Sequence, residues 1–382
     1  MTTPRENLLK VLRHEKPDWI PITGGFDSSV CPGREGMPSD LADALGDWAP
    51  AREPGLQLCR YLGLEVREVC PIPAKTSPRN VVFEQKTEGD TTTVIWHTPA
   101  GDLRHVYQVC RDPSGAVSSN YIEHAVKGPE DLDALAAVYE DEVIAPDPEG
   151  VKKIRQRREL IGNDGILLGG MVGTPLACMY RDFSGVATLA YLWADAPRTL
   201  LDCFAVMERN FLQRLRIGVR SDIEIDALMI GDDTSTTVIS PAMFEACNME
   251  LTNARAEAAH AAGKFYIHHS CGHLHDLLPL YRKTKMDAVD SFTVPPLGNV
   301  TVGEGRRLMG DRIAIIAGLQ HLVWKEDDRK ATRASIQKMI REAGKDGHFI
   351  LKLSPPFGAS PRWEQIRFVA DCCREMSGKR RS

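Results

Sequence analysis

Short apolar segments recur along the chain, and each is followed by a stretch in which apolar residues have helical spacing. Seven are clear, at residues 18–22, 165–171, 227–233, 264–270, 287–292, 312–318 and 348–354. Runs of this length suit buried strands, and strands that alternate with helices pair in parallel through right-handed crossovers. Seven or eight such units predict an α/β fold closed into a (β/α)8 TIM barrel rather than an open sheet.

Capping residues mark the helices between these strands. Ser240 followed by Pro241 is typical of an N-cap and a first helical residue, and the helix is expected to run to about Gly263. Another helix is expected to begin at Pro129, after Gly128. The helices therefore fall between predicted strands, as the barrel requires.

Residues 80–109 follow a different, two-residue period. Apolar and polar residues alternate at 81–83, 92–96 and 105–107, and turn residues separate these segments at 89–90 and 99–101. This pattern predicts an antiparallel, β-rich insertion at about residues 80–110, early in the barrel. The sequence has no repeat and no linker, so residues 1–382 are expected to form a single domain.

Composition and charge narrow the class of partner. The formal net charge is −5 and the only basic cluster is at residues 379–381, whereas nucleic-acid binding needs a concentrated basic surface. The apolar runs are strand-length, far below the roughly 18 residues of a membrane span. The first six residues are polar, and ten cysteines are scattered without framework spacing. A cytoplasmic protein that binds neither nucleic acid nor membrane is expected.

Histidine and cysteine are concentrated just after one predicted strand. Five of the eleven histidines lie at residues 260–275, and the densest segment contains His268, His269 and Cys271. Catalytic groups of a TIM barrel sit at the C-terminal ends of its strands, and a His and a Cys two residues apart can chelate zinc where the backbone turns. His268 and His269 are adjacent and face opposite sides of a strand, so at most one faces the mouth. A packing or solvent-facing role for the remaining histidines stays open.

The motifs in this region resemble a known superfamily. The segment 231–233, the cap at Ser240, the helix ending near Gly263 and the segment 269–272 resemble uroporphyrinogen decarboxylase-like proteins. The likeness is greatest to the corrinoid-dependent methyltransferase branch. The N-terminal segments 5–7 and 17–21, and residues 318–320, fit the same superfamily. The resemblance covers nearly the whole chain and implies the TIM-barrel fold.

Two departures restrict what the resemblance implies. Uroporphyrinogen decarboxylases carry an arginine-rich motif near the N-terminus that grips the substrate's carboxylates, and residues 22–27 here contain no arginine. Decarboxylation of a porphyrinogen is therefore not expected. Methylcobamide:coenzyme M methyltransferases bind zinc through a His-x-Cys pair and a later cysteine, and residues 353–358 contain no cysteine. His269 and Cys271 are retained, but a third ligand has to come from elsewhere.

Carboxylates at another strand end could complete the zinc site. Asp232 and Asp233 follow the apolar run 227–230, where they could bind a metal, act as a general base or cap the loop. The expected ligand set is His269, Cys271 and Asp232, with an open fourth position for catalysis.

Two further predictions concern other residues of the mouth. Some ether-cleaving methyltransferases of this superfamily use a zinc motif of two glutamates and a histidine. Its intervals are similar to those of Asp232, Cys247 and His268, which gives an alternative register with Asp and Cys in place of the glutamates. Gln320 and His321 end a predicted strand and are expected to hold the substrate or polarise its leaving oxygen, or to form a hydrogen-bonded pair in the loop.

The resemblance implies a function in corrinoid chemistry. The leading interpretation is a methyltransferase that moves a methyl group from an ether-type donor to Co(I) of a separate corrinoid protein, with zinc as Lewis acid. No corrinoid-binding Asp-x-His-x-x-Gly motif is present, so another polypeptide would carry the cobamide. Methyl transfer from a cobamide to a thiol, a decarboxylase-like lyase and a barrel that only binds a corrinoid or tetrapyrrole remain alternatives. The sequence leaves open whether the chain forms a homodimer.

Overall fold

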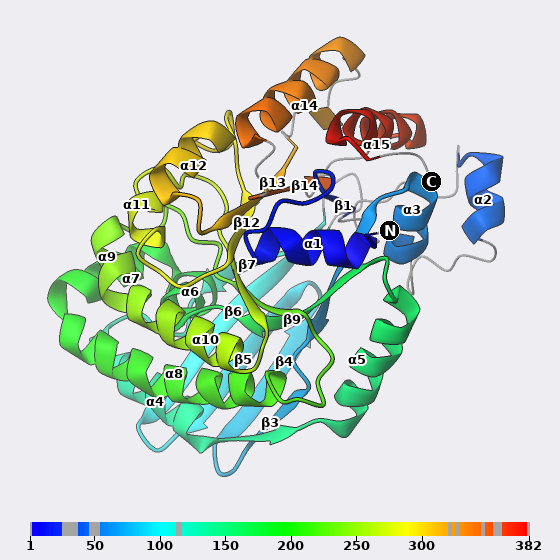
Figure 1. Ribbon diagram of the computed structural model, residues 1–382. Helices are drawn as coiled ribbons and strands as arrows, with labels where there is room; N and C mark the ends of the chain where they lie inside the picture. The colour runs from blue at the N-terminus through cyan, green and yellow to red at the C-terminus, as the bar shows by residue number, and fades with distance from the viewer. Residues whose placement is uncertain are drawn as a thin grey trace.

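The computed structural model describes residues 2–24, 37–45, 54–111, 117–319, 323–324, 328–344, 348–353 and 361–379. Eight parallel strands close a barrel in which each neighbour in space is hydrogen-bonded, and helices lie between the strands (Figure 1). In order around the barrel the strands are β1 (Ile22–Gly24), β14 (Phe349–Leu353), β13 (Ala314–Gly318), β12 (Ala288–Phe292), β11 (Phe265–His269), β10 (Ala227–Gly231), β9 (Gly165–Val172) and β2 (Glu65–Pro71). The predicted TIM barrel is confirmed.

Helices cover the outside of the barrel and close one end of it. They are α1 (Pro4–Leu12), α2 (Ser39–Leu45), α3 (Pro54–Leu62), the 3-10 turn η1 (Pro129–Asp131), α4 (Leu132–Asp141), α5 (Pro148–Ile161), α6 (Pro175–Cys178), the π-helical turn η2 (Met179–Phe183), α7 (Gly185–Asp195), α8 (Pro197–Gly218), α9 (Pro241–Cys247), α10 (Met249–Ala261), α11 (Leu278–Tyr281), α12 (Val302–Met309), α14 (Arg329–Ala343) and α15 (Trp363–Ser377).

The barrel interior has an apolar lower part that α1 closes. Leucines and a valine of α1 pack with Ile166, Ala227, Ile267, Ala288 and equivalent residues of the other strands in one buried cluster. Figure 1 shows α1 lying across the barrel strands. Because side chains alternate along a strand, the residues two positions further along these strands also face inward, nearer the opposite, C-terminal end. That open end is called the mouth below.

The early insertion is a separate antiparallel sheet. It consists of β4 (Val82–Glu88), β5 (Thr91–Thr98), β6 (Gly101–Arg111) and β7 (Val117–Glu123), paired in sequence order. A two-stranded sheet of β3 (Ala74–Pro78) and β8 (Glu142–Pro146) connects it to the barrel. The predicted insertion is confirmed and extends beyond residue 110. Leu103 of β6 belongs to the same core cluster as residues from Ile20 to Cys373, so the inserted sheet packs against the rest of the chain.

The β3–β8 sheet was not predicted, and three elements of the barrel and its helices also differ from the expectation. No strand was predicted at β2, whose residues Glu65, Arg67 and Glu68 interrupt the apolar run. The first barrel strand begins at Ile22 rather than ending there. The helix expected from Pro241 to about Gly263 is two helices, because the chain breaks at Asn248, whose side chain donates a hydrogen bond to Asp232.

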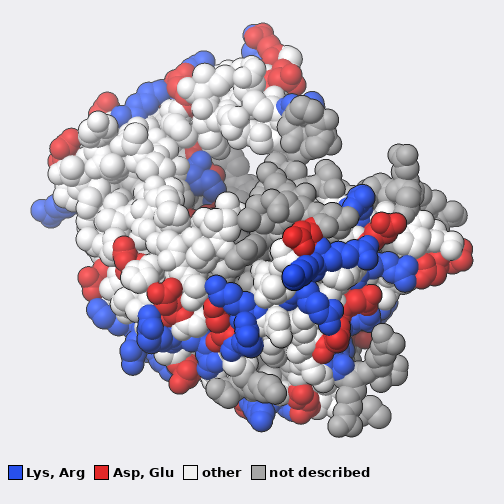
Figure 2. Space-filling view, turned by 90° about the horizontal axis from the view of Figure 1, so that it is seen from above, with Lys and Arg blue, Asp and Glu red and all other residues white. Residues whose placement is uncertain are grey.

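The face shown in Figure 2 has no large patch made of basic residues alone or of acidic residues alone. Basic and acidic side chains are intermingled there, mostly toward one edge, and a broad area beside a hollow carries few charges. Among the described residues, no helix is both long and apolar enough to span a membrane.

Candidate functional site

Two neighbouring strands deliver the candidate site. Gly231 of β10 lies opposite His269 of β11 in the parallel register, so Asp233 and Cys271, each two residues further on, emerge side by side at the mouth. Asp233 has φ +52°, in the left-handed region that Asp tolerates better than most residues. The chain turns sharply there and leaves the carboxylate beside the end of β11.

Gly272 makes the corresponding turn after Cys271. Its φ is +89°, and a Cβ atom at this position would lie 2.9 Å from Oγ of Ser235. Its amide donates a hydrogen bond of 3.0 Å to Oγ1 of Thr293, which fixes the turn. A glycine is needed here because a side chain would clash and the backbone conformation disfavours one. The turn keeps the Cys271 thiol close to the strand end.

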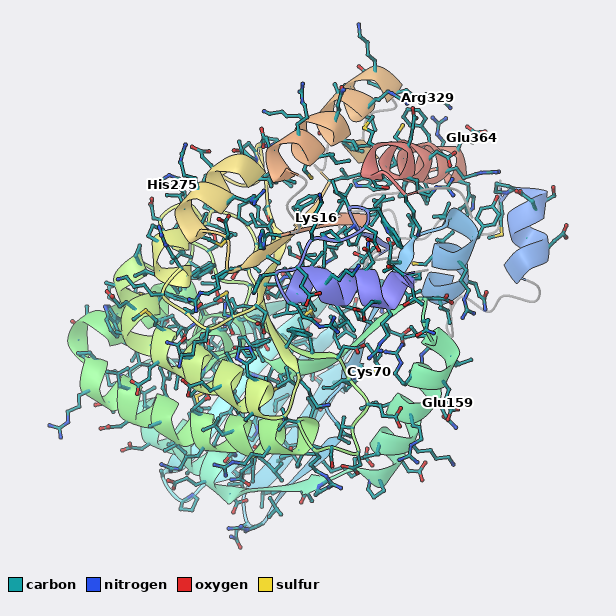
Figure 3. All side chains as sticks on the ribbon, viewed as in Figure 1. Lys16, Cys70, Glu159, His275, Arg329 and Glu364 are labelled. Atoms are coloured by element: carbon teal, nitrogen blue, oxygen red, sulfur yellow. The ribbon has the colours of Figure 1, made fainter. Side chains whose placement is uncertain are left out.

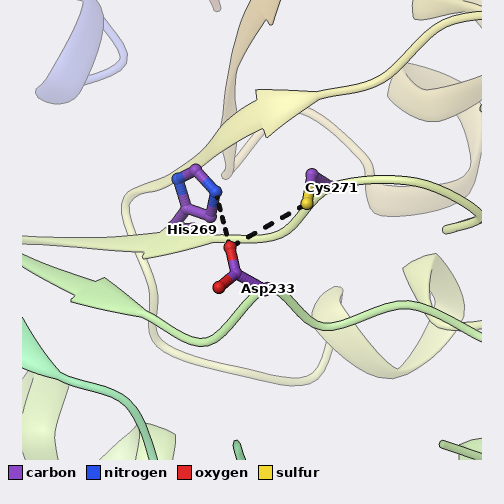
Figure 4. Close-up of side chains that lie close together, drawn as sticks. All are labelled: Asp233, His269 and Cys271. Atoms are coloured by element: carbon purple, nitrogen blue, oxygen red, sulfur yellow. Dashed lines mark hydrogen bonds and ion pairs between the residues drawn. The ribbon is translucent and has the colours of Figure 1, made fainter. Parts of the chain in front are cut away.

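Asp233, His269 and Cys271 form a compact cluster with three kinds of ligand atom. Nε2 of His269 lies 3.0 Å from Oδ1 of Asp233, and Sγ of Cys271 lies 3.9 Å from the same oxygen (Figure 4). One ligand atom from each residue lies within 4.8 Å of the other two. Over the described part of the chain, this is the one group of three or more His, Cys, Asp or Glu side chains with such proximity. The nitrogen, sulfur and oxygen donors suit zinc.

Negative charge concentrates around the imidazole of His269. Burial opposes its protonation, but hydrogen bonds to Asp233 and Asp290 outweigh burial and raise the pKa of His269 to about 11. The hydrogen bond from His269, with Arg181 assisting, lowers the pKa of the Asp233 carboxyl. The cluster is therefore built to hold positive charge between carboxylates, as a divalent cation would require.

Two further residues orient the members of the cluster. Asp290 of β12 approaches Nδ1 of His269 at 3.3 Å, on the ring edge opposite Asp233. Arg181 of η2 reaches Oδ2 of Asp233 at 3.5 Å and donates a hydrogen bond of 2.9 Å to the carbonyl of Gly231. Histidine metal ligands commonly have such a carboxylate on their second nitrogen. Arg181 leaves Oδ1 of Asp233 facing His269 and Cys271.

The structure places Asp232 away from this cluster. Its side chain is fully buried and accepts hydrogen bonds of 3.0 Å from Oγ1 of Thr174 and 3.0 Å from Nδ2 of Asn248. The Thr174 amide also donates to it. Asp232 therefore ties the loop after β9 to the start of α10, and the carboxylate beside His269 and Cys271 belongs to Asp233 instead.

The alternative register is only partly assembled. His268 is fully buried on the opposite side of β11 from His269, packed against Phe244 and Tyr281, and its Nε2 lies 3.5 Å from Oδ2 of Asp232. Burial lowers the pKa of His268. Cys247 is buried at the end of α9, and it joins neither residue in a three-ligand group within the described chain.

The remaining predicted residues are more dispersed. Gln320 and His321 lie outside the described residues. His275 lies at the periphery of the molecule, where it pairs with Asp276 (Figure 3). His273 contributes backbone groups, with its amide donating to Oγ of Ser235.

Sequence reasoning did not single out Arg67, Arg181 or Lys352. Arg67 and Lys352 face the barrel interior and both approach Asp290. For Lys352 the available signal was a charged residue inside the apolar run 349–353. Arg67 gave no such signal, because it lies among the charged residues Glu65 and Glu68 in a segment that was not predicted as a strand. Arg181 gave no such signal, since it lies on a short π-helical turn.

Comparisons with known proteins agree with this architecture. The sequence profile of the family described as uroporphyrinogen decarboxylase matches residues 115–376. A solved structure described as a methyltransferase from Methanosarcina mazei superposes with a TM-score of 0.61 at 14% identity, covering 98% of this chain and 99% of that one. At this identity the likeness concerns the fold.

Other barrels are more distant. A broad-specificity GH5-4 endoglucanase from an uncultured bacterium has a TM-score of 0.40 at 9% identity and covers 97% of this chain and 96% of its own. Ribulose-1,5-bisphosphate carboxylase/oxygenase from Pyrococcus horikoshii has a TM-score of 0.30 at 12% identity, with 60% and 47% covered. Neither bears on function. No curated protein sequence matches the chain.

Proposed function

Because the chain belongs to the uroporphyrinogen decarboxylase family, we propose that it is a methyltransferase that transfers a methyl group from a small ether-type donor to Co(I) of a corrinoid carried by a separate protein. The observation that carries the proposal is the Asp233, His269 and Cys271 cluster at the mouth of the barrel. Mixed nitrogen, sulfur and oxygen ligands with an open fourth position suit a catalytic rather than a structural zinc.

The three residues would hold zinc through Oδ1 of Asp233, Nε2 of His269 and Sγ of Cys271. Zinc, when bound, supplies a Lewis acid that stabilises the negative charge developing on the donor's leaving oxygen. The protein's own contribution is orientation. Asp290 faces the other nitrogen of His269, and Arg181 engages the outer oxygen of Asp233. Partners of this kind fix the direction of a ligand's lone pair.

The composition of the loops around the mouth supports the proposal that a separate corrinoid protein docks there. The segments 165–180, 234–244 and 291–303, which include or follow the ends of β9, β10 and β12, contain no Asp, Glu, Lys or Arg, although 26% of the chain is charged. Val172 and Leu297 on these segments are 40% and 53% exposed. Uncharged segments with exposed apolar side chains suit transient docking of another protein. The chain itself has no cobamide-binding motif.

The sequence favours methyl transfer over decarboxylation of a porphyrinogen. The arginine-rich motif that such substrates need is missing from residues 22–27. The reacting group nearest the mouth is instead a cluster of metal-ligand type, which methyl transfer from an ether would use and decarboxylation would not.

The test combines metal analysis with an assay of methyl transfer. Purified protein is expected to contain about one zinc per chain, and to demethylate methyl ethers only when a reduced corrinoid protein or cob(I)alamin is added. Methylcobalamin is detected by its absorbance. Full activity after exhaustive chelation would remove zinc from the proposal. Carbon dioxide release without a corrinoid would identify a decarboxylase instead.

A further inference from the structure

A layer of charged side chains lies directly above the apolar interior of the barrel. Arg67 of β2, Met229 of β10, Asp290 of β12 and Lys352 of β14 come from alternate strands, as the members of one interior layer do. We call this layer the charged floor. It contains two cations and one carboxylate, whereas the layer below it is apolar.

All the cations of the charged floor converge on one oxygen. Oδ2 of Asp290 lies 2.8 Å from Nη2 of Arg67 and 3.7 Å from Nζ of Lys352. The same oxygen is the one that faces Nδ1 of His269 at 3.3 Å. Among the described residues, no other carboxylate lies within ion-pair distance of Arg67 or Lys352. One negative charge therefore serves at least two positive ones.

The hydrogen bonding of the charged floor is also incomplete. The side chains of Arg67 and Asp290 are 6% and 1% exposed. Nε of Arg67 and Oδ1 of Asp290 are buried, and neither has a hydrogen-bond partner in the part of the chain that the structure describes. Buried polar groups are nearly always hydrogen-bonded, and buried charges are nearly always paired. Counted over the described residues, the floor thus has a surplus cation, an unused donor and an unused acceptor.

Lys352 makes the charged floor accessible from the mouth. Its side chain is 15% exposed, and its ammonium group contacts Oγ of Ser291 at 3.2 Å in addition to Asp290. Burial lowers the pKa of the Lys352 ammonium, and Asp290 opposes this effect. A second anion at this point would stabilise the ammonium further and complete the charge balance.

We propose that Lys352 and Arg67 form an anion subsite, and that the methyl donor is a small molecule with a carboxylate that binds there. His269 lies between the two parts of the site, with Asp233 on one ring edge and Asp290 on the other. A donor that bridges them therefore needs its carboxylate and its methyl ether only a short distance apart. This inference rests on the proposed function for the identity of the reacting group, but not for the binding of the anion.

The test compares carboxylates with uncharged amides of the same shape. Binding of acetate, benzoate and 4-methoxybenzoate, and of the three matching amides, is measured by calorimetry on the full chain, with zinc and after chelation. At least one carboxylate is expected to bind about tenfold or more tightly than its amide, as a charge-assisted hydrogen bond would provide. The preference is expected to persist after chelation, because it does not need the metal.

Variants assign the preference to the charged floor. Lys352→Met is expected to abolish it, while Arg67 and Asp290 still neutralise each other and keep the barrel folded. Lys352→Arg keeps the charge and is expected to retain the preference. Lys283→Met, which removes an exposed lysine paired with Glu245, serves as the matched control and should bind as the unmodified protein does.

The outcomes separate this inference from the proposed function. A carboxylate preference that disappears on chelation, or that survives Lys352→Met, would place the anion elsewhere and overturn the inference. Equal binding of all carboxylates and amides would also overturn it. A preserved preference in a protein that transfers no methyl group would leave the subsite standing and reject the methyltransferase. Efficient methyl transfer from neutral ethers that Lys352→Met does not change would support the methyltransferase and reject the anion subsite.

Discussion

At the scale of single residues, two adjacent carboxylates have different surroundings. Asp232 has no exposed surface and accepts hydrogen bonds from Thr174 and Asn248, whereas the side chain of Asp233 is 44% exposed and faces His269. A one-residue difference along the chain separates a buried structural anchor from a candidate ligand, because the chain turns at Asp233.

We expect Asp233→Asn to affect zinc binding and Asp232→Asn to affect stability. Asp233→Asn should reduce zinc affinity by more than the roughly 10–100-fold that follows from loss of an outer partner, while the thermal midpoint changes little. Asp232→Asn should lower the free energy of unfolding by about 2–3 kcal/mol, because it replaces a buried charged acceptor, and should leave the zinc content of the folded protein near normal. Metal analysis and urea unfolding measure the two effects. The reverse pattern would make Asp232 the ligand.

Arg181 offers a second test at this scale. It contacts Oδ2 of Asp233 without belonging to the cluster. Arg181→Met is expected to weaken zinc binding about tenfold, as loss of an orienting partner does, with the ligand set unchanged. Zinc titration against a chelator of known affinity gives the value, and Arg209→Met, at an exposed pair with Glu140, is the control. Unaltered zinc affinity in Arg181→Met would mean that Arg181 does not orient Asp233.

The sequence predicted His269 and Cys271 as ligands but did not predict which aspartate accompanies them. A histidine and a cysteine two residues apart after a strand are visible as a motif, and the register of β10 with β11 then brings Asp233 to them. The choice between Asp232 and Asp233 depends on the positive φ of Asp233, which composition does not reveal. Arg67 and Lys352 escaped notice because their role depends on which strands alternate around the barrel.

At the scale of elements, the pattern of apolar residues predicted the apolar strands of the barrel but not β2, which contains charged residues. β9 through β14 are recognisable runs of apolar residues, whereas β2 reads Glu-Val-Arg-Glu-Val-Cys-Pro. Its inward residue Arg67 contributes to the charged floor and Glu68 pairs with Arg157 outside the barrel, so neither face of the strand is purely apolar. The break at Asn248 escaped prediction for a similar reason, because it serves a tertiary hydrogen bond.

The pairing of β2 with β9 depends on a glycine. A Cβ atom on Gly165 would lie 1.8 Å from the carbonyl oxygen of Val66, whereas on Gly318 of β13 the nearest atom is 4.0 Å away. Gly165→Ala is expected to lower the free energy of unfolding by about 3 kcal/mol or more, since a backbone clash cannot be relieved by a rotamer change. Gly318→Ala, also in a barrel strand, should cost much less. Urea unfolding of both variants checks the difference, and equal stability would show that the two strands can separate.

At the scale of the whole molecule, buried and half-buried histidines couple stability to pH. Burial lowers the pKa of His14, after α1, and of His105 and His124, in and after the inserted sheet. Their folded values lie below the value of about 6.5 expected in an unfolded chain, so the unfolded state binds more protons as the pH falls through this range. Stability from these groups is complete above about pH 7.5 and is lost on acidification.

We therefore expect the contribution of these three histidines to the free energy of unfolding to fall between about pH 7.5 and pH 5. His105→Phe should reduce this slope, because the phenyl ring keeps the contacts with Trp96 and Tyr107 without titrating. His97 is half-buried, and its hydrogen bond to Asp102 raises its pKa, so His97→Phe should steepen the slope instead. Urea unfolding across this pH range measures both, and identical slopes would assign the pH dependence to other groups.

The mouth of the whole barrel is where a corrinoid protein would have to dock, and its rim predicts how that docking behaves. Steering by charge makes association sensitive to ionic strength, whereas the segments 234–244 and 291–303 carry no charge. The KM for a reduced corrinoid protein is therefore expected to change less than about threefold between about 50 mM and about 200 mM NaCl.

Leu297→Asp is expected to raise that KM at least about fivefold, because it places a charge in the apolar part of the contact, while kcat changes little. Leu160→Asp is the matched control. Leu160 is 46% exposed on α5, which leads into the start of β9 at the opposite end of the barrel. A steep salt dependence, or equal effects of the two variants, would mean that the corrinoid protein approaches by another surface. Direct transfer to free cob(I)alamin should be affected by neither variant, because it needs the mouth but not the rim.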